Sequence, residues 1–153
     1  GAAIWMIATF VGRWKWIGLI GTVLLSMQIF NNLPSPAALQ TDVNATSWST
    51  TIESDLQANN QAYLINFTAA WCITCQTNDK AALGRPRVKE FLSDQNIQYI
   101  KADWTNRNED IAMGLAKYNR TGIPLYIFWK PGMNKSKILP AVLTEDLLIR
   151  NMQ

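Results

Sequence analysis

Cys72 and Cys75 are the only cysteines in the chain, and they lie three positions apart. They follow an apolar stretch, residues 62–68, that reads as a buried strand. Two thiols at this spacing at the start of a helix can close into a disulfide and reopen. The chain contains no histidine, the side chain that most often serves as base and metal ligand near neutral pH. Thiol–disulfide exchange is therefore the chemistry that these residues favour.

The two sulfurs are expected to have different roles. Cys72 would lie at the N-terminus of a helix, where unpaired amide groups and the helix dipole favour an anion. This environment lowers the pKa of its thiol, so Cys72 is predicted to be the attacking sulfur. Cys75, one turn further along, is better shielded and would resolve the mixed disulfide. Trp71 places a large indole beside the exposed sulfur.

Three other interpretations of the cysteine pair compete with this one. A zinc site would need two further ligands, and without other cysteines or histidines it would require a dimer. A c-type haem attachment needs histidine directly after the second cysteine, and position 76 is glutamine. Inert buried cysteines are the strongest alternative, but inert cysteines need not fall at this spacing at a strand-to-helix junction. We therefore predict a redox-active disulfide between Cys72 and Cys75 and no other cofactor.

A second element supports the redox interpretation. Thr121-Gly122-Ile123-Pro124 precedes a strongly apolar strand, and proline is tolerated at the first residue of a strand. A cis peptide bond before Pro124 would be a deliberate local feature. An ordinary loop proline remains the alternative, because cis is the minority state of X-Pro bonds.

Charge argues against a nucleic-acid partner. Charged residues make up 16% of the 153 residues, and the net charge is +3. From Lys80 onward, lysines and arginines are scattered rather than clustered, which indicates a solvated surface instead of a phosphate-binding patch.

The second half of the chain alternates between helical and strand patterns. Thr50-x-x-Glu53 and Asn106-x-x-Glu109 are capping-box patterns that predict helix starts. Strands separated by helices imply parallel pairing, and the short Pro131-Gly132 connection implies one antiparallel hairpin. The predicted order is helix 51–59, strand 62–68, helix 72–82, helix 87–94, strand 97–103, a helix ending near 118–119, strand 124–130, strand 137–139 and a helix from Thr144.

Residues 1–30 are membrane-like. Residues 1–12 and 16–30 carry no charge, and Arg13-Trp14-Lys15 interrupts them. A helix over 16–33 would be roughly 27 Å long, close to the thickness of a bilayer core. We therefore expect the end of one helix, a basic turn and a last transmembrane helix. Because Gly1 opens directly into apolar sequence, we also expect the chain to be a piece of a longer protein.

The basic turn predicts an orientation. Arg13 and Lys15 mark the cytoplasmic side under the positive-inside rule, and no lysine or arginine occurs between Trp16 and Asp79. Everything after Phe30 should then lie outside the cytoplasm. A signal sequence is an alternative, although its n-region would be polar, and a buried helix of a soluble protein is another.

Two further segments follow the membrane segment. Residues 31–49 mix Asn, Pro, Ser, Ala and Thr with one charge, a composition typical of a linker. Residues 50–153 are predicted to form the folded domain.

Three segments together resemble the C-terminal domain of the DsbD family, the transmembrane thiol:disulfide interchange proteins. They are Asn66-Phe67-Thr68-Ala69-Ala70-Trp71-Cys72-Ile73-Thr74-Cys75, Lys101-Ala102-Asp103-Trp104-Thr105-Asn106 and Gly122-Ile123-Pro124-Leu125-Tyr126. The resemblance covers about 45–153, and the preceding apolar helix matches that family's last membrane span. It implies an α/β, thioredoxin-like fold, with a central mixed sheet flanked by helices and preceded by a transmembrane helix.

The resemblance also implies a function. The chain would be a membrane-tethered oxidoreductase that receives electrons from a transmembrane cysteine pair of the same protein. It would pass them to periplasmic thiol–disulfide proteins, cytochrome c biogenesis being one destination that the sequence leaves open. The domain would lie in the periplasm, anchored to a bacterial inner membrane. Ile123 and Pro124 would face the cysteine pair and bind the backbone of the partner.

One family position departs from the thioredoxin pattern. Asn66 lies where thioredoxins usually place a buried aspartate that manages protons, and an amide cannot accept a proton in that way. Asp79 matches an acidic position of the family and is the candidate for this work. A solvated helix acid is the equally weighted alternative, because an acid early in a helix is also favoured by the dipole.

Two alternatives to a disulfide reductase remain open. Ile73-Thr74 between the cysteines differs from the Gly-Pro of thioredoxin, so a disulfide oxidase or isomerase is possible until the reduction potential is known. A non-catalytic docking module that uses the same groove is the alternative from a different class.

Overall fold

The computed structural model describes residues 45–153. The expected membrane segment, residues 1–30, and residues 31–44 of the expected linker lie outside this range. No helix within 45–153 has the length and apolar character needed to cross a bilayer.

Within the described residues the chain forms a five-stranded mixed sheet in the order β1-β3-β2-β4-β5. β2 and β3 are parallel, as expected, and β4 and β5 form the expected antiparallel hairpin. β2 is the centre of the sheet, and all six of its residues are buried. The strands span Thr46–Ser47 (β1), Tyr63–Thr68 (β2), Gln98–Asp103 (β3), Leu125–Trp129 (β4) and Lys137–Ile138 (β5).

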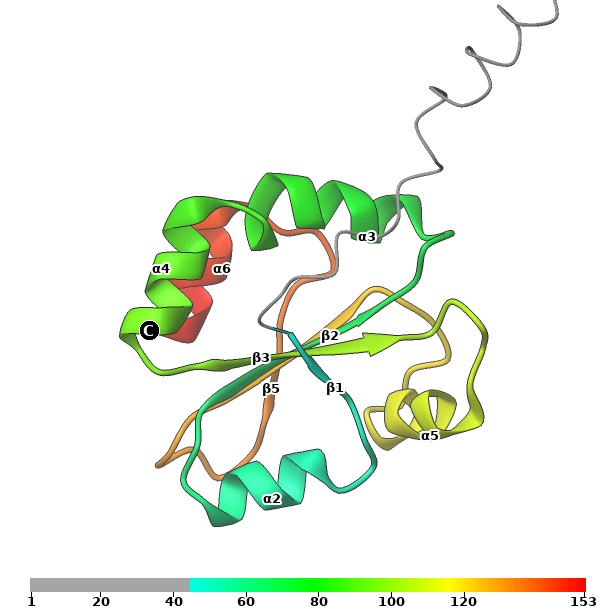
Figure 1. Cartoon of the computed structure of the whole chain (residues 1–153), viewed down its shortest axis with the longest axis horizontal. Coiled ribbons are helices and arrows are strands. Elements are labelled where there is room, and N and C mark those ends of the chain that lie inside the picture. The colour runs from blue at the N-terminus through cyan, green and yellow to red at the C-terminus, as the bar shows by residue number, and fades with distance from the viewer. Residues whose placement is uncertain (1–44) are drawn as a thin grey trace, which may run out of the picture. The chain divides into compact units, whose positions relative to one another are not determined.

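Helices cover both faces of the sheet. α3, α4 and α6 lie over one face, and α2 and α5 lie over the other (Figure 1). A π-helical turn, η1, follows α3 without a break. The helices span Ile52–Ala58 (α2), Ile73–Asn78 (α3), Asp79–Leu83 (η1), Pro86–Asp94 (α4), Glu109–Lys117 (α5) and Glu145–Met152 (α6).

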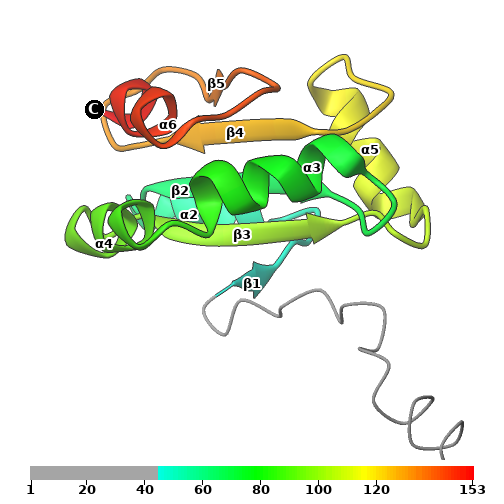
Figure 2. The ribbon, with the colours of Figure 1, turned by 90° about the horizontal axis from the view of Figure 1, so that it is seen from above.

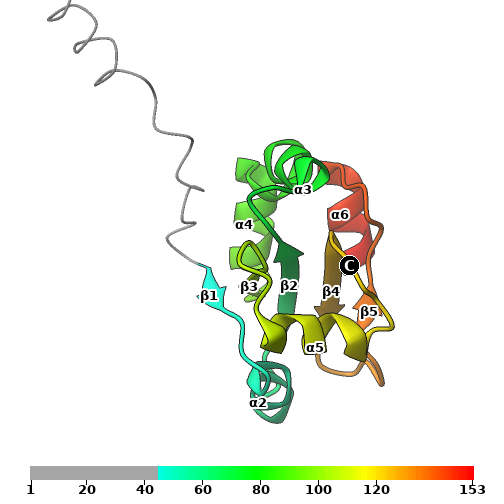
Figure 3. The same cartoon turned by 90° about the vertical axis from the view of Figure 1, so that its right-hand side faces the viewer.

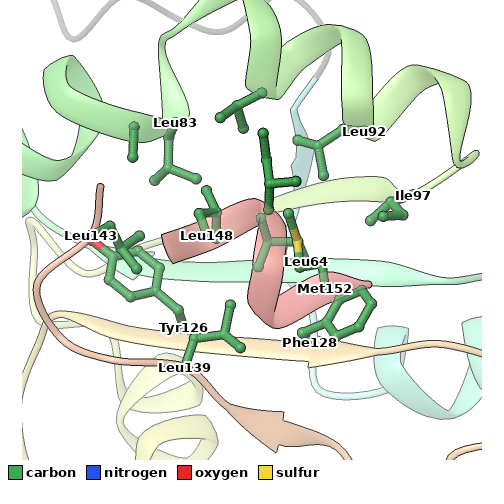
Figure 4. Close-up of a cluster of buried hydrophobic side chains, with 13 residues drawn as sticks. Leu64, Leu83, Leu92, Ile97, Tyr126, Phe128, Leu139, Leu143, Leu148 and Met152 are labelled. Atoms are coloured by element: carbon green, nitrogen blue, oxygen red, sulfur yellow. The ribbon is translucent and has the colours of Figure 1, made fainter. Parts of the chain in front are cut away.

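Alternation along the strands produces two hydrophobic clusters, one on each face. In β2, Leu64 faces α4 and α6, whereas Ile65 and Phe67 face α2 and α5. Figure 4 shows Leu64 and Phe128 of the sheet beside Met152 of α6. Fully burying a side chain of this size contributes about 1.5–3 kcal/mol, so the two clusters hold the sheet between its helix layers.

The parallel pairing expected for strands separated by a helix is wrong for β4. β4 runs antiparallel to β2, with Phe67 opposite Leu125, and the opposed arrows are visible in Figure 3. The reason is the path of α5, which crosses the strands at the end where β3 finishes instead of running back along the sheet (Figure 2). β4 therefore starts at the same end of the sheet at which β2 ends.

Both expected capping boxes are wrong, although both helices form. The N-cap of α2 is Thr51 without a side-chain cap, and the Glu53 carboxylate accepts a hydrogen bond from Lys117 Nζ at 2.9 Å. The N-cap of α5 is Asn108, whose Oδ1 accepts from the Asp110 amide at 2.7 Å. In α2 the contact of Glu53 with Lys117 replaces the expected cap. In α5 the cap lies at Asn108, two residues after the expected Asn106.

The sequence analysis did not predict β1. This edge strand falls in the stretch with linker composition. It runs parallel to β3, with Thr46 opposite Ile100. Trp48 follows it and packs its ring on Phe67 at a centroid distance of 5.8 Å. Gly114 of α5 makes room for this indole, because an added Cβ would come within 2.7 Å of the Trp48 ring.

Candidate active site

Cys72 and Cys75 form a disulfide at the start of α3, with a sulfur–sulfur distance of 2.03 Å. Cys72 is the N-cap of the helix, and its Sγ accepts a hydrogen bond from the Cys75 amide at 3.2 Å. Cys75 is completely buried, whereas Cys72 retains 8% of its surface. The helix amide that faces Cys72 is positioned to stabilise a thiolate there once the bond is reduced.

The loop before Cys72 is fixed by the segment after β3. The Ala70 amide donates to Thr105 Oγ1 at 2.9 Å, and Trp71 Nε1 donates to the Thr105 carbonyl at 3.1 Å. Asp103 in turn accepts from the Thr105 amide at 2.9 Å. The segment Lys101–Asn106 is part of the family resemblance, which gave Thr105 no role. In the structure, Thr105 holds the disulfide loop in place through its hydrogen bonds to Ala70 and Trp71.

Trp71 is held at the surface beside the disulfide. Its side chain is 47% exposed, and its ring lies 6.2 Å from that of Trp104. The Arg107 guanidinium lies 5.2 Å from the Trp71 ring centre and 5.7 Å from that of Trp104. Cation–π contacts at such distances contribute about 0.5–1 kcal/mol at exposed sites. Arg107 was not among the site residues predicted from the sequence, because a scattered arginine gives no signal from which it could be found.

The peptide bond between Ile123 and Pro124 is cis. Ile123 packs against the small cluster that contains Ala69 and both cysteines. Pro124 directly precedes Leu125, which pairs with Phe67 near the end of β2. Segments about fifty residues apart in sequence therefore meet at the disulfide through Ile123.

The Asn66 side chain contacts Asp79, which lies one helical turn after Cys75. Asn66 is fully buried in β2, and its Nδ2 donates to the Tyr99 hydroxyl at 2.8 Å and lies 3.5 Å from Asp79 Oδ1. Asp79 is half-buried, and its amide bonds the Cys75 carbonyl one turn back. Asn66 Oδ1 is buried without a hydrogen-bond partner among the described residues, so this polar site has an unused acceptor.

Asn78 fastens α3 to the loop before α6. This buried amide donates to the Tyr126 hydroxyl at 2.9 Å and to the Ala141 carbonyl at 2.7 Å, and it accepts from the Leu143 amide at 3.1 Å. Burial raises the pKa of Tyr126, the Asn78 hydrogen bond lowers it and the negative charge of Asp79 raises it again, and together they bring this pKa to about 12. The sequence analysis missed Asn78 because a polar residue within a helix usually faces solvent.

No metal centre is evident in the described part of the chain, where no three Cys, Asp or Glu side chains converge. The disulfide is thus the redox group that residues 45–153 contain.

The chain matches a known protein family and several curated proteins. A family model described as thioredoxin-like matches residues 45–131. Three curated relatives carry the name thiol:disulfide interchange protein DsbD. The relative from Campylobacter jejuni is 29% identical over 97 residues, which cover 63% of this chain and 17% of the relative. Those from Pseudomonas fluorescens and Salmonella typhi are 26% and 27% identical, and cover 74% and 80% of this chain.

Solved structures agree with the same fold. The C-terminal domain of Neisseria meningitidis DsbD, in its reduced form, superposes with a TM-score of 0.55 at 19% identity, covering 67% of this chain and 88% of that domain. A thioredoxin from Thermus thermophilus has a TM-score of 0.55 at 16% identity, covering 72% of this chain and 85% of the thioredoxin. These comparisons confirm the resemblance to the C-terminal DsbD domain that the motifs indicated. The chain spans only 17% of the length of the first of these curated relatives.

Proposed function

The chain belongs to the thioredoxin-like family, and from this premise we propose that it is a thiol:disulfide oxidoreductase that reduces disulfide bonds in other proteins. The observation that carries the proposal is the position of the Cys72–Cys75 disulfide. It lies at a helix N-terminus, beside a cis-proline loop, and Cys72 retains 8% of its surface whereas Cys75 is completely buried.

The exchange proceeds in two steps. In the first step, the Cys72 thiolate attacks one sulfur of the partner's disulfide, and the other partner sulfur leaves as a thiolate that takes up a proton. In the second, Cys75 loses its proton and attacks Cys72 Sγ, which expels the second partner sulfur. The partner gains two electrons and two protons, and the domain is left with the Cys72–Cys75 disulfide.

Four neighbouring side chains support these steps in the proposal. Ile123 and Pro124 bind the backbone of the partner beside the disulfide, and Trp71 offers an apolar surface next to Cys72. Asp79 accepts the proton of Cys75, a role that Asn66 cannot take. The support for this is the contact between the Asp79 and Asn66 side chains and the hydrogen bond of the Asp79 amide to Cys75.

Each cycle consumes two electrons, so the domain needs a donor. We propose that the donor is a cysteine pair in a transmembrane domain of the same protein, and that the acceptors are periplasmic thiol–disulfide proteins, including those of cytochrome c biogenesis. The domain then works in the periplasm, tethered to the inner membrane by residues 1–30 and a linker that begins at residue 31. The relatives named DsbD support a donor within the same protein, because they are thiol:disulfide interchange proteins several times longer than this chain.

The test is to trap the mixed disulfide in cells. Cys75→Ser should accumulate disulfide-linked adducts with partner proteins, visible on non-reducing gels and lost on reduction, because the resolving sulfur is absent. Cys72→Ser is the matched control and should accumulate none. Adducts of equal yield through Cys75 in the Cys72→Ser variant would reverse the two assigned roles.

Two measurements separate the alternatives. A reduction potential near that of thioredoxin, about −270 mV, supports a reductase, whereas one near about −120 mV indicates an oxidase. If Cys72→Ala leaves the reduction of periplasmic proteins unchanged in cells, the domain is a docking module and not an enzyme.

A further inference from the structure

A pocket of about 320 Å³ opens at the same end of the sheet as the disulfide. Residues before β4, among them Arg120 and Thr121, form one side, and residues 138, 139 and 141 form the other. Leu125 lines the pocket and pairs with Phe67 near the end of β2, five residues before Cys72. The volume is at the low end of the range for ligand sites, about 300–1,000 Å³, and suits one or two side chains.

Pro124 connects this pocket to the exchange site. Ile123 packs against the disulfide cluster, and its neighbour Pro124 is part of the pocket wall. A polypeptide that lies on Ile123 and Pro124 with its cysteine at Cys72 would therefore pass the mouth of the pocket. An extended chain advances about 3.3 Å per residue, so residues within three positions of that cysteine are within reach.

Arg120 determines the charge of the pocket. It is the only charged residue among those that line it. The Arg120 side chain is exposed, and within residues 45–153 no acidic group forms an ion pair with it. Guanidinium presents a planar fork of donors that matches a carboxylate. An acidic side chain would supply the missing partner.

We propose that this pocket is a specificity site that receives an Asp or Glu side chain of the partner polypeptide, located within three residues of the cysteine under exchange. The inference rests on the proposed disulfide exchange and adds a class of preferred substrate to it. Arg120 acts as the counter-charge, and the pocket wall at Pro124 aligns the acid with the disulfide.

A charge-swap experiment on the full chain, kept in detergent, tests this site. The reduced protein is mixed with symmetric peptide disulfides that carry Glu, Gln or Lys two residues from the cysteine, and the rate constant of peptide reduction is measured after acid quench. The readout is the ratio of the Glu rate to the Gln rate within each protein, which cancels general effects of a substitution. We expect a ratio of about two to five, the range of a solvent-accessible ion pair of about 0.5–1 kcal/mol, and a fall toward one in about 1 M salt.

Two substitutions at Arg120 and one control complete the design. Arg120→Gln should bring the ratio to about one, and Arg120→Glu should make the Lys peptide the preferred substrate. Lys135→Glu is the control, because it makes the same charge change on the exposed β4–β5 connection at the opposite end of the sheet, and it should retain the original ratio.

Different failures lead to different conclusions. If the unsubstituted protein reduces the Glu and Gln peptides at the same rate, the proposal of an acidic subsite is wrong while the exchange chemistry stands. The same conclusion follows if Arg120→Glu keeps the original preference for the Glu peptide. If the reduced protein reduces no peptide, the proposed function fails and the subsite fails with it.

Discussion

In the proposed exchange, Asp79 is the candidate base that accepts the proton of Cys75. Cys75 is completely buried, and a buried thiol resists ionisation because burial penalises the charged form. The resolving step therefore needs a base within reach of a site that water does not reach freely. Asp79 lies one turn after Cys75 and is half-buried against Asn66, which favours the role of a base over that of a fully solvated helix acid.

Asp79→Asn should therefore slow resolution of the mixed disulfide. At pH 7 we expect its lifetime to increase by about a hundredfold, the lower end of the range that is typical of general-base catalysis. The difference should shrink only well above the ordinary thiol value of about 8.5, because burial shifts the unaided ionisation of Cys75 to higher pH than that of an exposed thiol. Single-turnover reduction of a peptide disulfide, quenched and resolved by mass, measures this lifetime from pH 6 to pH 10.

Asp94→Asn provides the matched control for this prediction. Asp94 is an exposed acid at the end of α4, so its loss changes the net charge equally and should leave the lifetime unchanged. Equal lifetimes for Asp79→Asn and Asp94→Asn at pH 7 would return Asp79 to the role of a simple helix acid.

At the scale of the elements, a buried carboxylate links the two helices on one face of the sheet. Glu53 of α2 is only 4% exposed, and it accepts hydrogen bonds from Lys117 Nζ at 2.9 Å and from the Tyr118 hydroxyl. Burial, followed by the hydrogen bond to Glu53, raises the pKa of Tyr118 above its ordinary value of 10.0. The hydrogen bond from the Tyr118 hydroxyl to Glu53 exists only while the hydroxyl keeps its proton, so the stability of the α2–α5 layer depends on that proton.

The sign of this dependence is testable. The folded chain keeps the Tyr118 proton at a pH where the unfolded chain has lost it, so the contribution to stability is complete below about pH 10 and declines above it. Tyr118→Phe should make the fall in unfolding free energy above pH 10 shallower by up to about 1.4 kcal/mol per pH unit. At pH 7 the same variant should lose about 1–3 kcal/mol, because buried Glu53 loses a donor. Urea denaturation from pH 7 to pH 11.5 measures both quantities.

Lys117→Gln separates the two effects. It removes the positive charge that pairs with Glu53 at pH 7 but leaves the Tyr118 hydroxyl in place. The steep fall in unfolding free energy above pH 10 should therefore persist. Tyr63 and Tyr126 also have raised pKa values, so Tyr118→Phe should reduce the decline without abolishing it. An unchanged slope in Tyr118→Phe would show that this proton is not linked to folding.

The same helices show what could be predicted from the sequence. Helix and strand positions follow hydrophobic periodicity, and β2, β3, α4 and α6 lie where their patterns predict. The capping box at Thr50 failed because Glu53 bonds to partners far away in sequence, at Lys117 and Tyr118. The box at Asn106 failed because Asn108 caps α5 instead. The direction of β4 failed because it depends on the path of α5 across the sheet, which no local pattern determines.

Some residues of the site could be predicted from the sequence, and others could not. Cys72, Cys75 and Ile123 belong to motifs that were found from sequence, and the structure brings these three residues together. Thr105, Asn78 and Arg120 act through contacts between segments far apart in sequence. Their residue types are ordinary for a loop or a helix surface, so only the fold reveals them.

For the whole molecule, the central question is how a reducing dithiol is maintained where disulfides persist. Disulfides are stable in the periplasm and rare in the cytosol, so the proposed role requires the domain and its electron source to lie on defined sides of a membrane. The charge pattern of the chain predicts those sides, because Arg13 and Lys15 precede a long segment that lacks positive charge.

Accessibility of the two cysteines tests this orientation. In spheroplasts treated with a reductant and a maleimide that do not cross membranes, Cys72 and Cys75 should be labelled to the same extent as after lysis, while a cytoplasmic thiol protein stays unlabelled. Replacing both Arg13 and Lys15 by Glu removes the positive charge that holds the turn in the cytoplasm, and labelling before lysis should then fall severalfold. A matched pair of substitutions beyond the predicted span, Lys80→Glu and Lys89→Glu, changes the net charge equally and should leave labelling intact. Labelling that appears only after lysis would place the domain in the cytoplasm, where a membrane relay for its electrons would have no purpose.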